Sequence, residues 1–176
     1  DKQELSLSDG FVITVLFWIV LSVSGSIPFI LFGFGVVDSF FESMSGITTT
    51  GATVIAGLDD LPKSLLIYRQ LLQWLGGMGL IVLAIAVMPL LGIGGGQLFK
   101  TQTPGPMSEQ KLTPRITSTA RALWSIYLIL TVLCIFAYRL AGMNYFDAVS
   151  HAFSTVSIGG FSTHDLSIGF FDSLSI

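Results

Sequence analysis

Two stretches rich in threonine, serine and glycine contain the residue types that could bind an ion in this chain. They are residues 45–53 and 154–163, called the Thr/Gly stretches below. Closely spaced backbone carbonyls can replace the water shell of a cation, and hydroxyl groups at the inner end can add to such a ring. Glycine allows backbone angles closed to other residues and lets neighbouring segments approach closely. The pattern predicts a cation site made mainly of backbone carbonyls, without an organic cofactor. The candidate ligands are Thr49, Thr50, Gly51, Val156, Ser157, Ile158, Gly159 and Gly160.

Acidic residues are absent from both stretches, which bears on the kind of ion. Rings of Asp or Glu serve divalent or poorly selective cation pores, whereas carbonyl rings suit a weakly hydrated monovalent ion. The stretches therefore favour potassium as the transported ion.

The composition indicates a membrane protein. Of the 176 residues, 52% are hydrophobic and only 11% are charged, whereas a soluble domain carries about 25% charged residues. The net charge of −3 does not indicate the basic surface that binds nucleic acid. The single cysteine, Cys134, cannot form a disulfide within the chain.

Three long apolar runs are expected to position the two stretches. Residues 11–34, 64–95 and 119–142 are each long enough to cross a bilayer, for which about 20 residues suffice. Residues 39–50 and 144–156 are too short to cross and suit re-entrant half-helices, or pore helices. Non-helical backbone after such helices is tolerated at membrane depth only where it lines water or packs in protein.

The charges of the connectors predict the topology. The connector 96–118 is basic apart from Glu109 and should be cytoplasmic, because cytoplasmic loops carry an excess of Lys and Arg. The connector 52–63 carries Asp59 and Asp60 and should lie outside. The helix 11–34 then runs outward, and both Thr/Gly stretches fall near the outer, periplasmic side of a multi-pass protein.

A repeat also relates the two stretches. A spacing of 105 residues aligns Ser39 with Asn144 and Glu42 with Asp147, which predicts the same capped helix start in both copies. Beyond Thr50 this register requires three or four extra residues in the second copy.

The repeat predicts the division of the chain. Residues 1–95 form a first helix–pore-helix–helix repeat, 96–118 a linker, and 119–176 an incomplete second repeat. The filters are expected over 49–53 and 156–161. Four filter segments make a ring of carbonyls, so at least two more repeats are expected from further chain or from other subunits.

Three segments resemble the TrkH/TrkG family of potassium uptake proteins. Residues 40–53 (FFESMSGITTTGAT) and 146–163 (FDAVSHAFSTVSIGGFST) are similar to its first two pore loops, and residues 73–79 (QWLGGMG) are also typical of it. The resemblance implies an all-α, polytopic integral membrane protein with four tandem, potassium-channel-like repeats on one chain. It further implies a homodimer in the bacterial inner membrane, gated by a cytoplasmic nucleotide-binding ring of the TrkA type.

Three other functions remain to be separated from potassium uptake. A sodium-permeable relative would replace a filter glycine by serine, whereas Gly51 and Gly160 are kept here. An intramembrane serine hydrolase could use His151 and Ser154, although no Gly-x-Ser-x-Gly motif is present. A structural membrane subunit would explain packing glycines but not the duplicated stretches. We therefore expect a transport protein and not an enzyme.

Two basic side chains within the apolar segments have open roles. Arg69 either extends to the membrane surface or is a buried cation that pairs with an acid or a half-helix C-terminus. His151 is expected to pack or hydrogen-bond in the second half-helix rather than to bind a metal.

Overall fold

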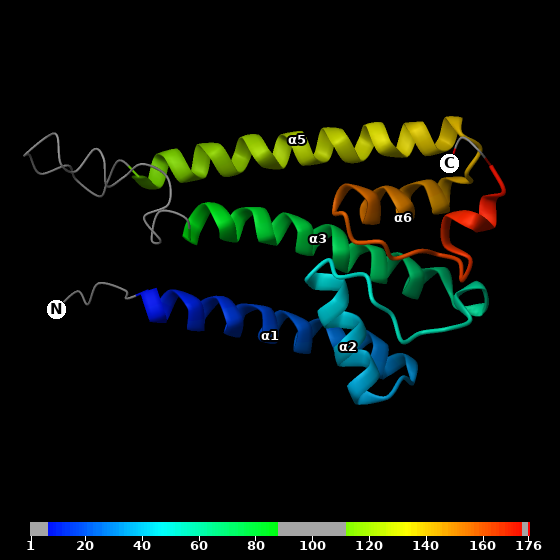
Figure 1. Ribbon diagram of the computed structural model, residues 1–176, viewed down its shortest axis with the longest axis horizontal. Coiled ribbons are helices and arrows are strands. Elements are labelled where there is room, and N and C mark those ends of the chain that lie inside the picture. The colour runs from blue at the N-terminus through cyan, green and yellow to red at the C-terminus, as the bar shows by residue number, and fades with distance from the viewer. Residues whose placement is uncertain (1–6, 88–111, 174–175) are drawn as a thin grey trace, which may run out of the picture.

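The computed structural model of the chain describes residues 7–87, 112–173 and 176, and in these ranges it contains helices and no strands (Figure 1). The prediction of an all-α fold is confirmed. The α-helices are α1 (Leu7–Phe32), α2 (Val36–Ile47), α3 (Lys63–Val87), α5 (Leu112–Leu140) and α6 (Tyr145–Val156). Two short 3-10 helices, η1 (Leu58–Asp60) and η3 (Ser167–Phe171), follow α2 and α6.

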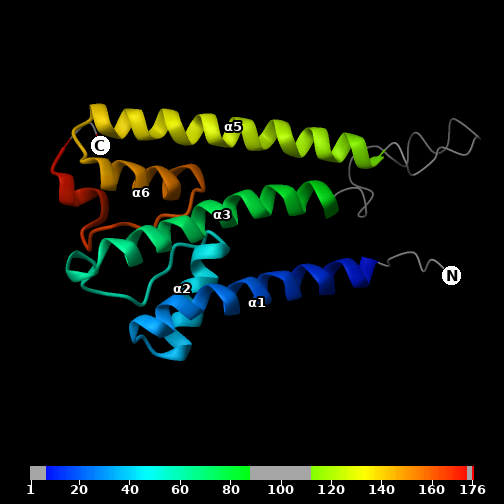
Figure 2. The same ribbon diagram turned by 180° about the vertical axis from the view of Figure 1, so that it is seen from behind.

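The long helices α1, α3 and α5 lie side by side, and the short helices lie at one end of them (Figures 1 and 2). Helix α3 packs against both short helices, with α1 against α2 on one side and α5 against α6 on the other. Both short helices and their following loops therefore reach the same end of the molecule, away from the starts of α1 and α5.

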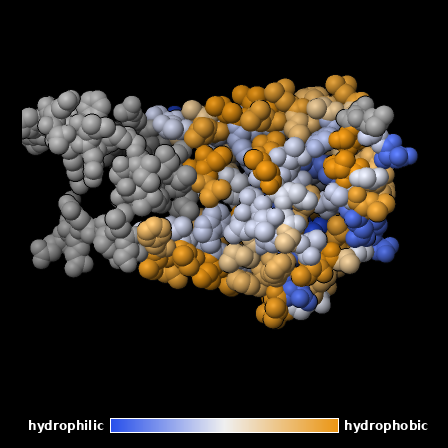
Figure 3. All heavy atoms as spheres, in the orientation of Figure 1, coloured by the Kyte–Doolittle hydropathy of each residue, from blue (hydrophilic) through white to orange (hydrophobic). Residues whose placement is uncertain are grey.

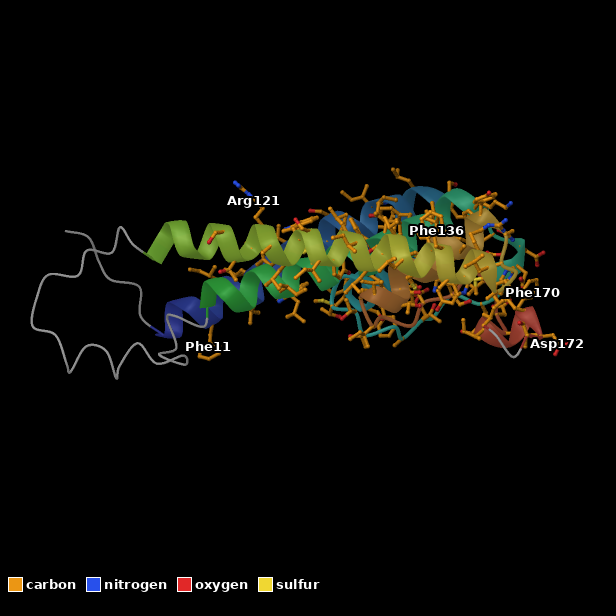
Figure 4. The ribbon with its side chains drawn as sticks, turned by 90° about the horizontal axis from the view of Figure 1, so that it is seen from above. Phe11, Arg121, Phe136, Phe170 and Asp172 are labelled. Carbon is orange, nitrogen blue, oxygen red and sulfur yellow. The ribbon has the colours of Figure 1, made fainter. Side chains whose placement is uncertain are left out.

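The surfaces of α1 and α5 are suited to lipid. Within these helices, the segments Gly10–Phe32 and Ser118–Leu140 are long and apolar enough to cross a membrane by length and composition. Figure 3 shows hydrophobic side chains along both edges of the molecule, with a more polar band between them. In Figure 4, Phe11 and Arg121 lie toward one end, and Phe170 and Asp172 lie at the other.

The long helices depart from the predicted bounds at their ends. Helix α1 ends at Phe32, before the predicted limit of 34, because Gly33 turns the chain with a φ of +111°. Pro28 lies inside α1 without ending it. Helix α5 begins at Leu112, within the predicted linker 96–118, and ends at Leu140. Helix α3 begins at Lys63, and the predicted continuation over 88–95 lies outside the described residues, as do residues 96–111.

The first short helix begins earlier than expected. Helix α2 runs from Val36 to Ile47, three residues before the predicted 39–50, so Ser39 is not its N-cap. The N–H of Ser39 donates to the Gly35 carbonyl inside the helix. In contrast, Asn144 caps α6 as predicted, because its side chain accepts a hydrogen bond from the Asp147 N–H.

The repeat has a spacing of 109 residues, not the predicted 105. At this spacing Gly33 corresponds to Gly142 and Gly51 to Gly160, and the members of each pair have similar positive φ values. The first pair shares a φ of +111°, and the second has φ values of +77° and +84°. With this register no insertion is needed at the helix ends, and α2 and α6 begin and end at matching positions. The predicted match of Glu42 with Asp147 was wrong by one helical turn, since Glu42 corresponds to His151.

Candidate ion-binding site

Two short loops follow the C-termini of α2 and α6, and we name residues 48–51 loop 1 and residues 157–160 loop 2. Their backbones turn in the same way, with Thr49 at a φ of +56° and Ile158 at +58°. A positive φ is uncommon for a residue other than glycine and is disfavoured for a β-branched one. Such strain costs about 1–3 kcal/mol and clusters at ligand-binding sites. The matching strain marks both loops as specialised segments.

The hydrogen bonds at the two helix ends also match. The N–H groups of Thr50 and Gly159 donate to Ser45 and Ser154 respectively, at 2.9 and 2.8 Å. The hydroxyl of Ser157 donates to the Phe153 carbonyl at 2.8 Å, as that of Thr48 donates to Met44 at 2.7 Å.

These bonds fold loops 1 and 2 against the last turns of α2 and α6, where the negative ends of the helix dipoles lie.

The two loops touch at their glycines. A methyl group added at Gly51 would overlap the backbone carbonyl oxygen of Gly159, with the α-carbon of Gly160 close behind. The approach is possible because Gly51 has no side chain and adopts a φ of +77°. One carbonyl of loop 2 is thereby brought against the backbone of loop 1.

The other predicted ligands are distributed around this contact. Thr49 is half-buried, and Thr50 is exposed with its hydroxyl 2.8 Å from that of Thr48. Val156 is the last residue of α6 rather than part of loop 2. Ile158 is 89% exposed, so it makes little contact with the rest of the described protein.

Sequence reasoning left the role of Arg69 open, and the structure shows it to be a buried cation paired with an acid. Both Arg69 and Glu42 have 0% exposed side chains, and their Nη2 and Oε1 atoms lie 2.7 Å apart. The surface-directed orientation considered for Arg69 is therefore wrong. The sequence pattern had placed Glu42 at a helix start and so gave no indication of this ion pair. The only sequence feature that pointed to it was the charge of Arg69 within an apolar run.

Helix α3 contacts both loop regions through one stretch of sequence. The Gln73 side chain lies against Gly159, and its Oε1 accepts the Phe161 N–H at 3.1 Å. A methyl group at Gly76 would overlap the Ile47 carbonyl at the end of α2. At Gly77 it would come within 2.9 Å of the Ser157 β-carbon. Gly76 and Gly77 of the QWLGGMG segment thus let α3 pack directly against the ends of α2 and α6.

His151 is a packed, hydrogen-bonded residue, as predicted. Its Nδ1 lies 3.0 Å from the Asp147 carbonyl oxygen and its Nε2 lies 3.1 Å from the Ser162 hydroxyl. The Ser154 hydroxyl donates to the backbone carbonyl of His151 rather than to the ring. Ser154 therefore does not form with the His151 ring the hydroxyl–imidazole pair that was considered for a serine nucleophile.

A polar cluster joins the segments that follow the two loops. His164 contacts Asp59 through Nδ1, and its Nε2 lies 3.3 Å from Asp147. Asp165 accepts the Gly57 N–H at 3.1 Å. The hydrogen bond with His164 holds the pKa of the Asp59 carboxyl below its usual range. The ring of Phe170 stacks on that of His164, with centroids 3.5 Å apart.

Comparisons with known proteins agree with the predicted family. The family model of TrkH, described as cation transport protein, matches residues 1–176. The Trk system potassium uptake protein TrkH of Vibrio parahaemolyticus is 61% identical over 178 residues, covering 99% of this chain and 37% of that protein. The Trk system potassium uptake protein TrkG of Escherichia coli K12 is 51% identical over 173 residues, covering 97% of this chain and 36% of that protein.

A solved structure extends the likeness to three dimensions. The crystal structure of the potassium transporter TrkH from Vibrio parahaemolyticus matches with a TM-score of 0.82 and 57% identity. The match covers 99% of this chain and 35% of that one. The chain thus spans little more than a third of the length of these relatives. On the match over its whole length, the chain belongs to the TrkH family of cation transport proteins.

Proposed function

We propose that this chain contributes two of the ion-binding loops of a bacterial potassium uptake protein. The observation that carries the proposal is the contact of loops 1 and 2 at Gly51 and Gly159, at the ends of two short helices related by the repeat. The relatives support potassium as the ion, because they are named potassium uptake proteins and not enzymes.

The proposed mechanism exchanges water for protein oxygens. A potassium ion that enters from the outer side loses water and binds to carbonyl oxygens of the predicted ligand residues in both loops. The negative ends of the α2 and α6 dipoles stabilise the dehydrated ion. Two further loops of the same kind complete the ring.

The family supports a matching location and assembly for this protein. We place it in the bacterial inner membrane as a multi-pass protein, with residues 96–118 in the cytoplasm and loops 1 and 2 near the periplasm. We further propose that it forms a homodimer within the lipid bilayer and is regulated by a cytoplasmic nucleotide-binding ring of the TrkA type.

A chimera provides the test of this function. The chain replaces the matching 178-residue segment of the Vibrio parahaemolyticus relative, and the product is expressed in a bacterium that lacks its own potassium uptake systems. We expect growth at low potassium, and flux in liposomes that favours potassium over sodium. Gly51→Val should abolish both, because its side chain displaces the Gly159 carbonyl.

Three outcomes would contradict the proposal. Equal sodium and potassium flux would favour the sodium-permeable relative. A chimera without ion flux that is labelled by serine-reactive probes would favour a hydrolase. A chimera that inserts and assembles normally without flux or labelling would favour a structural subunit.

A further inference from the structure

Arg69 contacts parts of both repeats with a single side chain. Its Nε and Nη2 bind Glu42 of α2, and Nη2 also donates to the Thr53 hydroxyl at 3.0 Å. Its Nη1 donates to the backbone carbonyl of Ser162 at 3.1 Å. The guanidinium lies over the Phe161 ring, 4.4 Å from the centroid. All three of its nitrogens are therefore bound, and none is directed to solvent.

The two loop segments are held at equivalent positions. Thr53 lies two residues after Gly51, and Ser162 lies two residues after Gly160, so the 109-residue spacing matches them. Arg69 thus joins the chain at the same place beyond each loop, two residues after its last glycine. A change in its length or shape would shift one loop along the other.

The surroundings require a charged, forked side chain at this point. Glu42 accepts hydrogen bonds from the Thr53 hydroxyl at 2.9 and 3.0 Å and from the Val54 N–H at 3.2 Å. His151 takes the place of Glu42 in the second repeat and contacts the Ser162 hydroxyl. Arg69 has its acidic partner on one side and a neutral carbonyl on the other. A guanidinium fork can bind both at once, whereas a lysine ammonium is a point charge.

We propose that Arg69 is a positioning residue that sets the position of loop 1 relative to loop 2 along the ion pathway. It thereby sets the discrimination between potassium and sodium. The proposal rests on the proposed function of the loops. It goes beyond a structural ion pair, because it assigns to Arg69 an effect on ion selectivity and not only on stability.

The test uses the chimera described above and measures the potassium-to-sodium permeability ratio together with the unfolding temperature. Arg69→Lys retains a cation for Glu42 but cannot reach Thr53 and Ser162 together. We expect the ratio to fall about tenfold, which corresponds to the loss of one hydrogen bond to a charged group being expressed as weaker discrimination between the two ions.

Arg139→Lys is the matched control. Arg139 is also near the outer end of a long helix, where it donates to the Met143 carbonyl and lies 4.0 Å from the Tyr145 ring centroid. Those contacts are with the turn between α5 and α6 and with the first residue of α6, and not with either loop. The permeability ratio should be unchanged in this variant.

A second pair of variants decides the matter if Arg69→Lys does not fold. Thr53→Val removes the hydroxyl that accepts from Arg69 and keeps the size of the side chain, whereas Thr53→Ser keeps the hydroxyl. The ratio should fall in the valine variant and be restored toward the parent value in the serine variant.

The possible results separate this inference from the proposed function. A parent chimera without potassium flux overturns both. A conducting parent whose ratio is unchanged by Arg69→Lys, or which has equal ratios in Thr53→Val and Thr53→Ser, overturns the inference alone. A lower unfolding temperature with an unchanged ratio would show that Arg69 only stabilises the fold.

Discussion

Replacement of Gly51 by alanine tests whether the contact between the loops matters for ion passage. The added methyl group meets two obstacles. Gly51 has a φ of +77°, and the methyl group would overlap the Gly159 carbonyl oxygen. Gly57 is a matched control, because its φ is +75° and, among the described residues, nothing lies within 4 Å of an added β-carbon.

The expected losses of stability follow from the backbone conformation and from the steric overlap. A left-handed conformation costs a residue with a β-carbon about 1–2 kcal/mol, and this cost applies to Gly51→Ala and Gly57→Ala alike. Overpacking adds about 1–3 kcal/mol in Gly51→Ala alone. We expect the control to lose about 1–2 kcal/mol of stability and Gly51→Ala about 2–5 kcal/mol. If about 1.4 kcal/mol of the overlap appears as weaker ion binding, potassium flux at limiting concentration falls about tenfold.

The assay compares both variants of the chimera in liposomes and by thermal unfolding. Potassium flux per correctly assembled protein should be reduced in Gly51→Ala and near the parent value in Gly57→Ala. Equal flux in the two variants would refute the reasoning, because it would show that the Gly159 carbonyl need not be near its present position.

Three further predictions concern stability. Gly76→Ala should destabilise the protein by about 1–3 kcal/mol, since its methyl group overlaps the last carbonyl of α2. Gly79→Ala in the same helix meets no described atom within 4 Å and should stabilise the protein by up to about 1 kcal/mol. Thermal unfolding of the two variants checks that stability falls in the first and rises in the second. Asn144→Ala should cost about 1 kcal/mol through loss of the α6 cap. Ser39→Ala should be neutral or stabilising, because the buried Ser39 hydroxyl has no partner in the described part of the chain. Equal losses of stability in Asn144→Ala and Ser39→Ala, measured by chemical unfolding, would contradict the 109-residue register. For Asp59, a pKa lowered in the folded state means that its contribution is present above the ordinary value of about 3.9 and is lost as the pH falls through the folded value. The difference in unfolding temperature between the parent and Asp59→Asn should therefore disappear at acid pH, and a constant difference from pH 7 to strongly acid conditions would argue against this role.

Local chemistry made much of the fold predictable. Long apolar runs predicted α1 and α5, and the Asn144 cap with Asp147 predicted the start of α6. These features depend on residues close together in sequence. The start of α2 was missed because its N-cap is Gly35, which makes no side-chain hydrogen bond, whereas Ser39, four residues later, is of a more typical capping residue type.

Tertiary contacts explain what the sequence did not reveal. The repeat was aligned through two acids, Glu42 and Asp147, yet the acid that corresponds to Asp147 is Asp38 in the first turn of α2. The role of Glu42 depends on Arg69, and local patterns cannot show that these residues meet. The contact of Gly51 with Gly159 likewise depends on how α3 packs against both short helices.

The duplicated units are free to diverge because they are encoded separately. The position that holds the Glu42 carboxylate in one unit holds the imidazole of His151 in the other. A channel assembled from four identical subunits would repeat every substitution in all four quadrants. In this chain a substitution in one unit leaves the other unit unchanged, so the two units present different side chains at equivalent positions, and engineered changes at those positions will not have equal effects.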